Sequence, residues 1–520
     1  EQEVSSLAAF VNRRSVDQPR AALTGSKVWE DYGNALGLRP EALAFTLTRF
    51  TQAQSGGSAM PEEDWAQVTV EPGEACTILL LDADGNPTAD PPKGVSVACS
   101  AQNNTWTYEI QGLERYAPNG MPWQYRVTET VPDSYRAEQG TASQLAAYRA
   151  EEPYHIQMGQ LKNSLTGSAS FQKQWRDESG ASLAADYFGE ISVTFTLQVR
   201  EENTADWEDA EQYFEKKLTE PVLSALFLTG GSGQPEDRSA YFQKTLTGRV
   251  NQAKGWSGSF AGLPMYRQEG TGAVKLEYRA AETKIAWGQG SGRTVLTVRP
   301  NNSDAGTSLE YESISSLFPF HLPSGTVTEK DYSQSSLLSH SQTANRLKTT
   351  QLTVEKQWEN DGENAYHTRP ASNASGLDWQ VDFLVQVDSG APGEHWQSVK
   401  DYGAGGQDVV LSVAGKNSAA SAEATLARLP LLSETTRYRA VELQNGWKRS
   451  QDGSIPAEYY VDTGDRCFTS YTLTQWENHS QEAGGAASFR TTAVNTMEST
   501  SAAAAKSWET YRNQNYERTP

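Results

Sequence analysis

Four lysines in this sequence each stand two residues before a tryptophan, in stretches rich in strand-forming residues. They are Lys27, Lys173, Lys356 and Lys506. In the stretch TVEKQWEND, for example, the period-two alternation of a β-strand places Lys356 on the same face as Trp358. An unpaired ammonium group on an apolar face costs several kcal/mol. An inward lysine at these positions therefore requires a partner, or a reaction that removes its charge.

A glutamate and an asparagine recur after three of these lysines. The glutamates end the segments YRVTE, YRAAE and YRAVE, and the asparagines lie within LKNSL, TANRL and AVNTM. Strand alternation places these residues among apolar neighbours, as it places Glu282 with Tyr278 and Asn345 with Leu347. We therefore expect three inward sets of one lysine, one glutamate and one asparagine. Their acidic and amide members are Glu129, Glu282, Glu442, Asn163, Asn345 and Asn495.

The simplest interpretation of one such set is a buried ion pair beside a hydrogen-bonded amide. Such a pair adds little net stability, because desolvation offsets the Coulomb attraction. A single Lys-x-Trp segment on its own is most simply an edge-strand lysine that extends over an indole ring. The threefold recurrence, in the same order along the chain, favours a shared chemical role instead.

The composition favours an all-β chain of several domains. A chain of 520 residues is too long for a single domain with one ordinary hydrophobic core. The 42 glycines and 22 prolines separate many short stretches of Val, Thr, Tyr, Phe and Trp. The net charge of −21, with no Lys/Arg-rich stripe, argues against nucleic acid as a partner. No run approaches the roughly 20 apolar residues of a membrane helix, and the first residues lack a signal pattern. We therefore expect no membrane segment in this fragment.

Laying the chain on itself from each Lys-x-Trp divides it into repeats. The segments LRP, TRP and RTP follow three of the lysines by about a dozen residues and place Arg39, Arg369 and Arg518 in matching positions. Each asparagine precedes the next lysine by only about ten or eleven residues, which predicts stiff head-to-tail stacking. The predicted divisions are 1–20 as the end of a preceding repeat, 21–167, 168–349 and 350–498 as complete units, and 499–520 as the start of a following repeat.

The second unit carries an insertion with helical spacing. In ADWEDAEQYFEKKLTEPVLSALFL, the residues Trp207, Ala210, Tyr213 and Leu218 fall on or near one face of a helix. We expect this helix to pack on the sandwich. Because insertions on a rigid scaffold often carry binding, the segment is also a candidate ligand surface.

The order of these motifs resembles the collagen-adhesin B-type (Cna-B) domains of Gram-positive bacterial surface adhesins and pilins. The resemblance rests on Lys-x-Trp, the following Arg-Pro, Leu-Pro before Tyr-x-x-x-Glu and the terminal Asn, and it covers nearly the whole chain. It implies tandem Ig-like (prealbumin-like) β-sandwich domains in an elongated rod. Two departures concern loops: the second unit has DYFGE in place of Arg-Pro, and the first has LERYAP where Leu-Pro is expected.

The resemblance implies an autocatalytic intramolecular isopeptide bond in each unit. Burial lowers the pKa of Lys and raises that of Glu, so a neutral amine can attack the Asn carbonyl while Glu assists proton transfer and ammonia leaves. No cofactor or metal is needed. Lys506 and Asn12 are expected to stay unbonded, because this sequence lacks their partners. The implied sets are Lys27 and Asn163 with Glu129, Lys173 and Asn345 with Glu282, and Lys356 and Asn495 with Glu442.

We therefore expect a stalk segment of a cell-wall-anchored bacterial surface adhesin, extracellular and without turnover catalysis on an external substrate. Its partners would be neighbouring repeats of the same chain. Two alternatives stay open: a ligand-binding module for a host extracellular-matrix protein or glycan through the insertions, or accessory β-sandwich modules of a secreted carbohydrate-active enzyme.

Cysteines and possible metal ligands are few. Cys76 and Cys99 flank a segment that could form a hairpin, so a local disulfide is possible, although a free, partly buried thiol is the simplest interpretation for both and for Cys467. LDADGNPTAD offers Asp82 and Asp84 to calcium, but Asp-Gly-Asn is more simply a hairpin turn. The six histidines are scattered and show no zinc-binding spacing.

Overall fold

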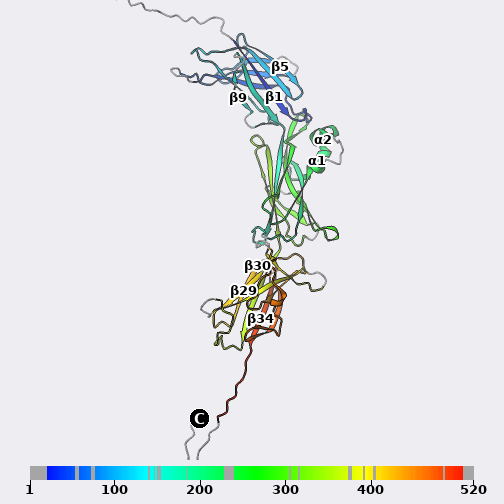
Figure 1. Cartoon of the computed structure of the whole chain (residues 1–520). Coiled ribbons are helices and arrows are strands. Elements are labelled where there is room, and N and C mark those ends of the chain that lie inside the picture. The colour runs from blue at the N-terminus through cyan, green and yellow to red at the C-terminus, as the bar shows by residue number, and fades with distance from the viewer. Residues whose placement is uncertain are drawn as a thin grey trace, which may run out of the picture.

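In the computed structural model the regular secondary structure is mostly β-strand, arranged as three successive pairs of packed sheets placed end to end (Figure 1). We name these pairs unit 1 (strands β1 to β11), unit 2 (β12 to β23) and unit 3 (β24 to β34). The all-β, tandem-sandwich fold predicted from the sequence is confirmed. The structure describes residues 20–52, 58–71, 76–138, 141–145, 147–148, 154–183, 185–227, 239–303, 306–313, 317–372, 378–389, 393–401, 406–483 and 486–506.

Unit 1 has one sheet in the order β10-β11-β1-β6-β5, with β8 paired to β11, and a facing sheet in the order β4-β3-β2-β7-β9. Its strands are β1 (Arg20–Glu30), β2 (Leu43–Phe50), β3 (Glu63–Val70), β4 (Thr77–Leu80), β5 (Ser96–Gln102), β6 (Thr105–Glu114), β7 (Gln124–Glu129), β8 (Arg136–Ala137), β9 (Ser143–Leu145), β10 (Ala147–Tyr148) and β11 (His155–Ser164).

Unit 2 has one sheet in the order β16-β12-β23-β22-β20 and another in the order β14-β13-β18-β19-β21, in which β15 also pairs with β13 and β17 with β18. Its strands are β12 (Thr166–Asp177), β13 (Ile191–Glu201), β14 (Glu208–Asp209), β15 (Gln243–Gly248), β16 (Ser257–Pro264), β17 (Tyr266–Glu269), β18 (Gly272–Trp287), β19 (Thr294–Pro300), β20 (Ser308–Leu309), β21 (Tyr311–Ser313), β22 (Ser324–Glu329) and β23 (Leu337–Leu347).

Unit 3 has one sheet in the order β30-β24-β34-β33-β32 and another in the order β26-β25-β29, with β31 paired to β25 and a separate pair β27-β28. Its strands are β24 (Thr349–Glu359), β25 (Trp379–Asp388), β26 (Gln397–Ser398), β27 (Lys400–Asp401), β28 (Gln407–Asp408), β29 (Val410–Gly415), β30 (Ser421–Pro430), β31 (Arg437–Glu442), β32 (Arg466–Phe468), β33 (Tyr471–Ala483) and β34 (Ala486–Met497).

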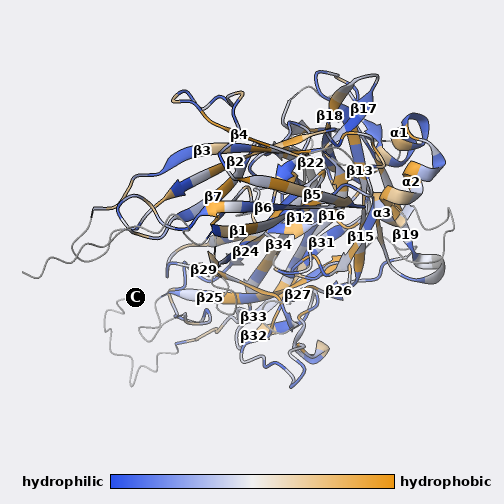
Figure 2. Cartoon of the chain, turned by 90° about the horizontal axis from the view of Figure 1, so that it is seen from above, coloured by the Kyte–Doolittle hydropathy of each residue, from blue (hydrophilic) through white to orange (hydrophobic). Residues whose placement is uncertain are grey.

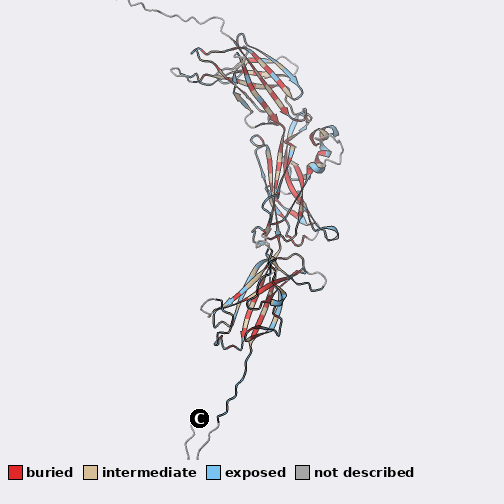
Figure 3. Cartoon of the chain, viewed as in Figure 1, coloured by how far each residue is buried: buried red, intermediate tan, exposed pale blue. Residues whose placement is uncertain are grey.

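The three units share one strand arrangement. In each, the first strand lies between the last strand, to which it runs parallel, and a third strand, to which it runs antiparallel. The first strands alternate buried and partly exposed residues, as β1 and β24 show, because one strand face lies against the facing sheet. Figure 3 shows the buried residues along the strands within each unit, and Figure 2 shows hydrophobic and hydrophilic residues interleaved along them.

Only one residue separates consecutive units. Leu165 stands between β11 and β12, and Lys348 stands between β23 and β24. The Leu165 N–H donates to Glu30 of unit 1, and its carbonyl accepts the N–H of Met265 in unit 2. The Lys348 N–H likewise donates to the carbonyl of Pro319 in unit 2, and the Lys348 carbonyl accepts the N–H of Leu431 in unit 3. The backbone of each connecting residue is therefore bonded to both units that it joins.

The insertion in unit 2 forms separate short helices instead of the one helix predicted. Helices α1 (Ala210–Lys217) and α2 (Glu220–Phe227) are followed by α3 (Ser239–Phe242). The chain is extended at Leu218, which ends α1. Pro221 accounts for the break, because its ring would clash with the Lys217 carbonyl in a continuous helix. Of the predicted apolar face, Ala210 and Tyr213 are buried in α1, whereas Trp207 precedes the helix.

The structure joins Cys76 to Cys99, so the interpretation of these two residues as free thiols is wrong. Between the two cysteines the chain makes a short hairpin with an antiparallel bridge from Leu81 to Pro87. The strands that carry the bond do not pair with each other, because β4 pairs with β3 in one sheet and β5 with β6 in the other. The bond therefore ties the two sheets of unit 1 together. Cys467 is a free, buried thiol, as expected.

Candidate functional site

The strand register brings each inward lysine to the asparagine of the last strand. Asn163 lies opposite Trp29, Asn345 opposite Trp175 and Asn495 opposite Trp358. In every unit the lysine stands two residues before that tryptophan, so it shares the tryptophan's face and lies diagonally across from the asparagine. The parallel pairing of the first and last strands therefore sets the same Lys-to-Asn relation three times.

The glutamates approach from the facing sheets. Each glutamate lies at the end of a strand, or within a strand, and that strand pairs with the second long strand of its unit. In every case the residue directly opposite the glutamate is a phenylalanine: Glu129 pairs with Phe45, Glu282 with Phe195 and Glu442 with Phe383. The glutamate therefore projects across the sandwich toward the lysine and asparagine. All nine side chains are buried, and none of these residues is more than 6% exposed.

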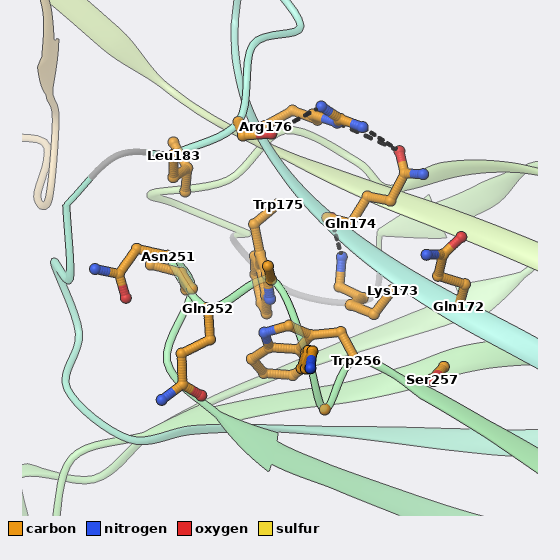
Figure 4. A pocket seen from close by; sticks show the side chains of 15 residues that line it. Gln172, Lys173, Gln174, Trp175, Arg176, Leu183, Asn251, Gln252, Trp256 and Ser257 are labelled. Carbon is orange, nitrogen blue, oxygen red and sulfur yellow. Dashed lines mark hydrogen bonds between the residues drawn. The ribbon is translucent and has the colours of Figure 1, made fainter.

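Unit 2 shows the most complete contacts. Lys173 Nζ donates to Asn345 Oδ1 at 2.7 Å and lies 3.5 Å from Glu282 Oε2. Asn345 Nδ2 donates to Glu282 Oε1 at 2.9 Å. Lys173 also donates to the Gln174 carbonyl at 2.9 Å, a bond drawn in Figure 4. The amine, the carboxamide and the carboxyl group thus form one closed set of contacts.

Unit 3 repeats this arrangement with a small shift of the amine. Asn495 Nδ2 donates to Glu442 Oε1 at 2.6 Å, and Lys356 Nζ lies 3.5 Å from Glu442 Oε2. Lys356 donates to the carbonyls of Gln357 and Ala493 at 3.1 and 3.3 Å. Ala493 lies two residues before Asn495, so the amine lies beside the strand that carries the asparagine.

In unit 1 the contact that the structure records is the ion pair. Lys27 Nζ donates to Glu129 Oε1 at 2.8 Å, and both side chains are fully buried. Asn163, also fully buried, lies on the adjacent strand in the same register as its counterparts. The three sets are therefore alike in strand position and burial.

Burial perturbs the pKa values toward the neutral forms. It lowers the pKa of Lys27 and of Lys173 to about 8, against the opposing effect of the nearby glutamates, and it lowers the pKa of Lys356 as well. Burial raises the pKa of Glu129 and of Glu282, against the effect of the lysines. A buried amine with a lowered pKa, in contact with an amide whose other side meets a carboxyl group, is suited to nucleophilic attack on that amide.

A second buried cluster lies beside the site in units 1 and 3, and only its arginine was found from the sequence. Arg39 donates to Asp31 at 2.8 Å, Tyr135 donates to the same carboxylate at 3.0 Å, and the guanidinium carbon lies 5.5 Å from the Trp29 ring centre. In unit 3 the same cluster is Asp361, Arg369 and Tyr471 on Trp358. The signal that was missed is an Asp four or five residues after the first three of the four lysines.

Unit 2 lacks this arginine, as its DYFGE segment predicts. Phe320 packs on Trp175 with ring centres 5.4 Å apart, where units 1 and 3 place a tyrosine. Beside Trp175 the unit has a pocket of about 410 Å³, lined in part by Trp256, Asn251 and Gln252 (Figure 4). The indole rings of Trp175 and Trp256 meet edge to face at 5.3 Å.

The remaining predicted residues can be placed briefly. Lys506 is exposed, while Asn12 and Arg518 lie outside the described residues. Asp82 accepts the backbone N–H groups of Asp84 and Asn86, which fits the predicted turn. Within the described ranges, no group of three or more His, Cys, Asp or Glu side chains could hold a metal ion. The helices that the structure describes include none that is long and apolar enough to cross a membrane.

Solved structures that resemble this chain include a repeat unit of a bacterial surface protein, a pilin subunit and a pilus adhesin. One is a single B repeat unit (B1) of the collagen binding surface protein (Cna) of Staphylococcus aureus, at 14% identity over 63% of this chain and 99% of that one, with a TM-score of 0.15. Another is the major pilin subunit BcpA of Bacillus cereus, at 10% identity over 92% of this chain and 100% of that one, with a TM-score of 0.19.

A third likeness is to the open conformation of the pilus adhesin SpaC from Lactobacillus rhamnosus GG, at 14% identity and a TM-score of 0.21. It covers 93% of this chain but only 44% of that one, so the chain spans less than half the length of SpaC. These global scores are low.

No curated protein matches the chain. A family model does match, over residues 62–147, and it is described as the Cna protein B-type domain. The matched segment lies within unit 1 and includes Glu129, the acidic member of that unit's set. Residues 62–147, within unit 1, are therefore similar to the Cna protein B-type domain.

Proposed function

We propose that this chain is a load-bearing segment of a bacterial surface adhesin or pilus-like stalk, in which each unit is closed by an isopeptide bond between Lys and Asn. The observation that carries the proposal is the recurrence of the lysine, asparagine and glutamate in one register. The family match to part of unit 1 supports extending the B-type domain to units 2 and 3, whose strand arrangement is the same.

The reaction needs only groups that the chain supplies. The neutral amine of Lys173 attacks the side-chain carbonyl carbon of Asn345, and the new C–N bond forms as the C–NH₂ bond breaks. Glu282 takes a proton from the attacking nitrogen and delivers it to the departing amide nitrogen, which leaves as ammonia. The fold holds amine and amide in contact, so proximity supplies much of the rate. The products are one secondary amide and one ammonia molecule for each unit.

The site is consumed by this reaction, so we do not propose turnover on an external substrate. Its consequence is mechanical, because the bond joins the first strand of a unit to the last. Tension that enters at one end of a unit then passes through the side-chain amide instead of peeling the strands apart. The bond also restricts the unfolded chain, as a disulfide does, and it is independent of redox conditions. We further propose that the protein is held at the cell wall through regions outside this sequence.

The test is the intact mass of the purified chain. Each bond releases one ammonia, so three bonds lower the mass by about 17 Da each and about 51 Da in total. The measurement is made after reduction and denaturation, so that the bond between Cys76 and Cys99 contributes nothing. Peptide mapping should then find Lys173 joined to Asn345 in a single branched fragment.

The matched control replaces a lysine that belongs to none of the three sets. Lys162 pairs with Glu30 at the surface of unit 1, next to Asn163 in the sequence. The Lys162→Ala chain should keep the whole mass deficit, whereas Lys173→Ala should lose one increment. A wild-type chain whose mass equals that of its unmodified residues would refute the proposed function.

A further inference from the structure

A β-bulge occupies the same place in all three units, beside the start of the first strand. In unit 1, Ala21 pairs with Leu113 and Leu23 with Ile110, so that two residues face one. The same shift in register occurs between β12 and β16 and between β24 and β30. The second residue of the bulge is Gly112 in unit 1, Gly262 in unit 2 and Arg428 in unit 3.

All three bulge residues have a left-handed backbone. The φ angle is 82° at Gly112, 71° at Gly262 and 63° at Arg428. Glycine adopts this region without strain, whereas a residue with a side chain does not. Arginine in unit 3 therefore replaces the residue type that best suits this backbone.

The bulge of each following unit faces the turn that ends the first strand of the unit before it. At the junction of units 1 and 2, the Tyr32 hydroxyl donates to the Gly262 carbonyl at 3.1 Å. A Cβ atom on Gly262 would lie 3.0 Å from that hydroxyl oxygen, so this contact leaves little room for a side chain. At the junction of units 2 and 3, Arg428 instead extends to Asp177, with Nε 3.3 Å from Oδ2.

Asp177 is the counterpart of Asp31 and Asp361, which each pair with an arginine of their own unit. Unit 2 lacks that arginine, and the Asp177 carboxylate accepts bonds from the Ser179 hydroxyl and the Ala181 N–H through one oxygen. Its other oxygen meets Arg428. The Asp177 side chain is only 6% exposed, so the guanidinium reaches a nearly buried anion at the end of the preceding unit.

We propose that the bulge and the preceding turn form a unit-to-unit docking surface, and that Arg428 and Asp177 make the surface between units 2 and 3 specific. The partner that this surface of unit 3 fits is an anionic turn whose carboxylate pairs with no arginine of its own unit, as Asp177 does among the described residues of unit 2. A unit whose bulge carries glycine fits a turn that presents a hydroxyl group, as unit 2 fits unit 1. This inference does not depend on whether the isopeptide bonds form.

The experiment measures the spread of distances between units 2 and 3 in the full chain. Spin labels are attached at Thr326→Cys and Ser421→Cys, two exposed positions in units 2 and 3. Double electron–electron resonance then gives the distance distribution. The native Cys467 is buried and its pKa is raised to about 12, chiefly by burial, so its thiol does not compete for the label.

Arg428→Gln removes the charge and keeps the left-handed strain, and Asp177→Asn removes the other charge and keeps the side chain's size. Both should broaden the distribution at least twofold, while Arg428→Lys should stay close to wild type. Arg428→Gly relieves the backbone strain, so it supplies a well-folded variant that should broaden the distribution equally. The control Arg466→Gln removes an exposed arginine that pairs with Glu498 inside unit 3.

Unchanged distributions in both Arg428→Gly and Asp177→Asn would refute the proposal, as would equal broadening in Arg466→Gln. The junction between units 1 and 2 provides an independent test. Gly262→Ala should displace Tyr32 and broaden the distance distribution between labels on units 1 and 2, but leave that between units 2 and 3 as in wild type. No broadening between units 1 and 2 would show that the bulge is not a docking element there.

Discussion

At the scale of single residues, burial governs the chemistry of the lysine, glutamate and asparagine sets. An ammonium and a carboxylate in water would be charged and unreactive toward an amide. Inside the sandwich, the pKa of Lys173 falls to about 8 and that of Glu282 rises, both chiefly because burial disfavours charge. In the proposed reaction, Lys173 is therefore the nucleophile and Glu282 the proton carrier.

Glu282→Ala should block bond formation in unit 2 alone. Without the carboxyl group there is no carrier for the proton that must leave the amine, although Lys173 and Asn345 stay in adjacent strands. The intact mass should rise by about 17 Da relative to the fully bonded chain, after correction for the substitution itself. Hydrogen exchange of unit 2 peptides in urea should show earlier unfolding than in wild type.

The control for this variant is Glu277→Gln in the same strand. Glu277 is buried and pairs with Arg200, away from the amine. Loss of the Glu277 carboxylate should lower the stability of unit 2 without changing the number of isopeptide bonds. Equal loss of the 17 Da deficit in both variants would mean that general destabilisation, and not the Glu282 carboxyl group, prevents the reaction.

Asn345→Ala gives a second residue-scale prediction, for the pH dependence of stability. It leaves Lys173 unreacted and buried, with a pKa near 8 in the folded chain against an ordinary value of 10.5. Between these values the unfolded chain binds the proton that the folded chain releases, so the unfolding free energy rises with pH across this window. The gain from about pH 8 to 10 should be on the order of 1 to 3 kcal/mol.

The measurement is urea unfolding of unit 2 in the Asn345→Ala chain, followed by hydrogen exchange at several pH values. The double variant Asn345→Ala with Lys173→Met lacks the titrating amine, so it serves as the reference for every other group. A pH slope that is the same in both chains would contradict the prediction, because it would come from groups other than Lys173.

At the scale of elements, the turn after the first strand carries a charged cluster that supports the tryptophan beside the site. Arg369→Met should leave the Asp361 carboxylate buried without a cation, since only the neutral donors Tyr471 and the Asn364 N–H then remain. Breaking such a pair costs about 3 to 5 kcal/mol. The loss should appear as earlier urea unfolding of unit 3 peptides in an Asn495→Ala background, where no covalent bond masks the change.

Arg466→Met is the matched comparison, because Arg466 and Glu498 form an exposed pair in the same unit. An exposed pair contributes little to stability, because solvent screens the attraction. The double variant Asp361→Asn with Arg369→Met should recover part of the stability, since no buried charge then lacks a partner. If Arg369→Met and Arg466→Met cost the same, the cluster does not support unit 3 as described.

Elements also show where sequence reasoning succeeded and where it failed. Period-two alternation was enough to place Lys173 and Asn345 inward, because a strand's side-chain direction is local. The break between α1 and α2 was also predictable from the local sequence, because Pro221 marks it. The prediction failed because the apolar spacing was interpreted as one helix that continues across this proline. The bond between Cys76 and Cys99 depends on how the two sheets pack, and no local pattern encodes that.

The contact between Arg428 and Asp177 was also beyond sequence reasoning. Arg428 aligns with Gly112 and Gly262, and that substitution was a visible signal of something unusual. Its partner, however, lies in another unit, and a left-handed backbone cannot be told from a strand pattern alone. Contacts between units depend on the junction geometry, which short-range periodicity does not determine.

At the scale of the whole molecule, the covalent path proposed here bypasses most of each unit. Lys173 and Asn345 are 172 residues apart in the sequence but in contact in the fold. Fully extended, a stretch of that length spans about 600 Å. Under tension, a bonded unit cannot release this stretch, because the load passes through the side-chain amide.

Lys173→Ala should therefore add one unfolding event to the force–extension trace of the full chain. Its contour-length gain should approach about 600 Å, less the folded length of unit 2. The wild-type chain should show no gain of that size from unit 2 before the attachment fails. Lys162→Ala is again the control, and a release of similar length in the wild-type or control chain would rule out the covalent path.

The single-residue connections at Leu165 and Lys348 have one more consequence. Each connecting residue has its N–H bonded to one unit and its carbonyl bonded to the next, so its two dihedral angles are both restrained. Rotation of neighbouring units about the long axis would have to break these bonds, so they oppose it together with the side-chain contacts at each junction. A group carried at one end of this segment would then have a defined rotational orientation about the long axis as well as a defined distance from the other end.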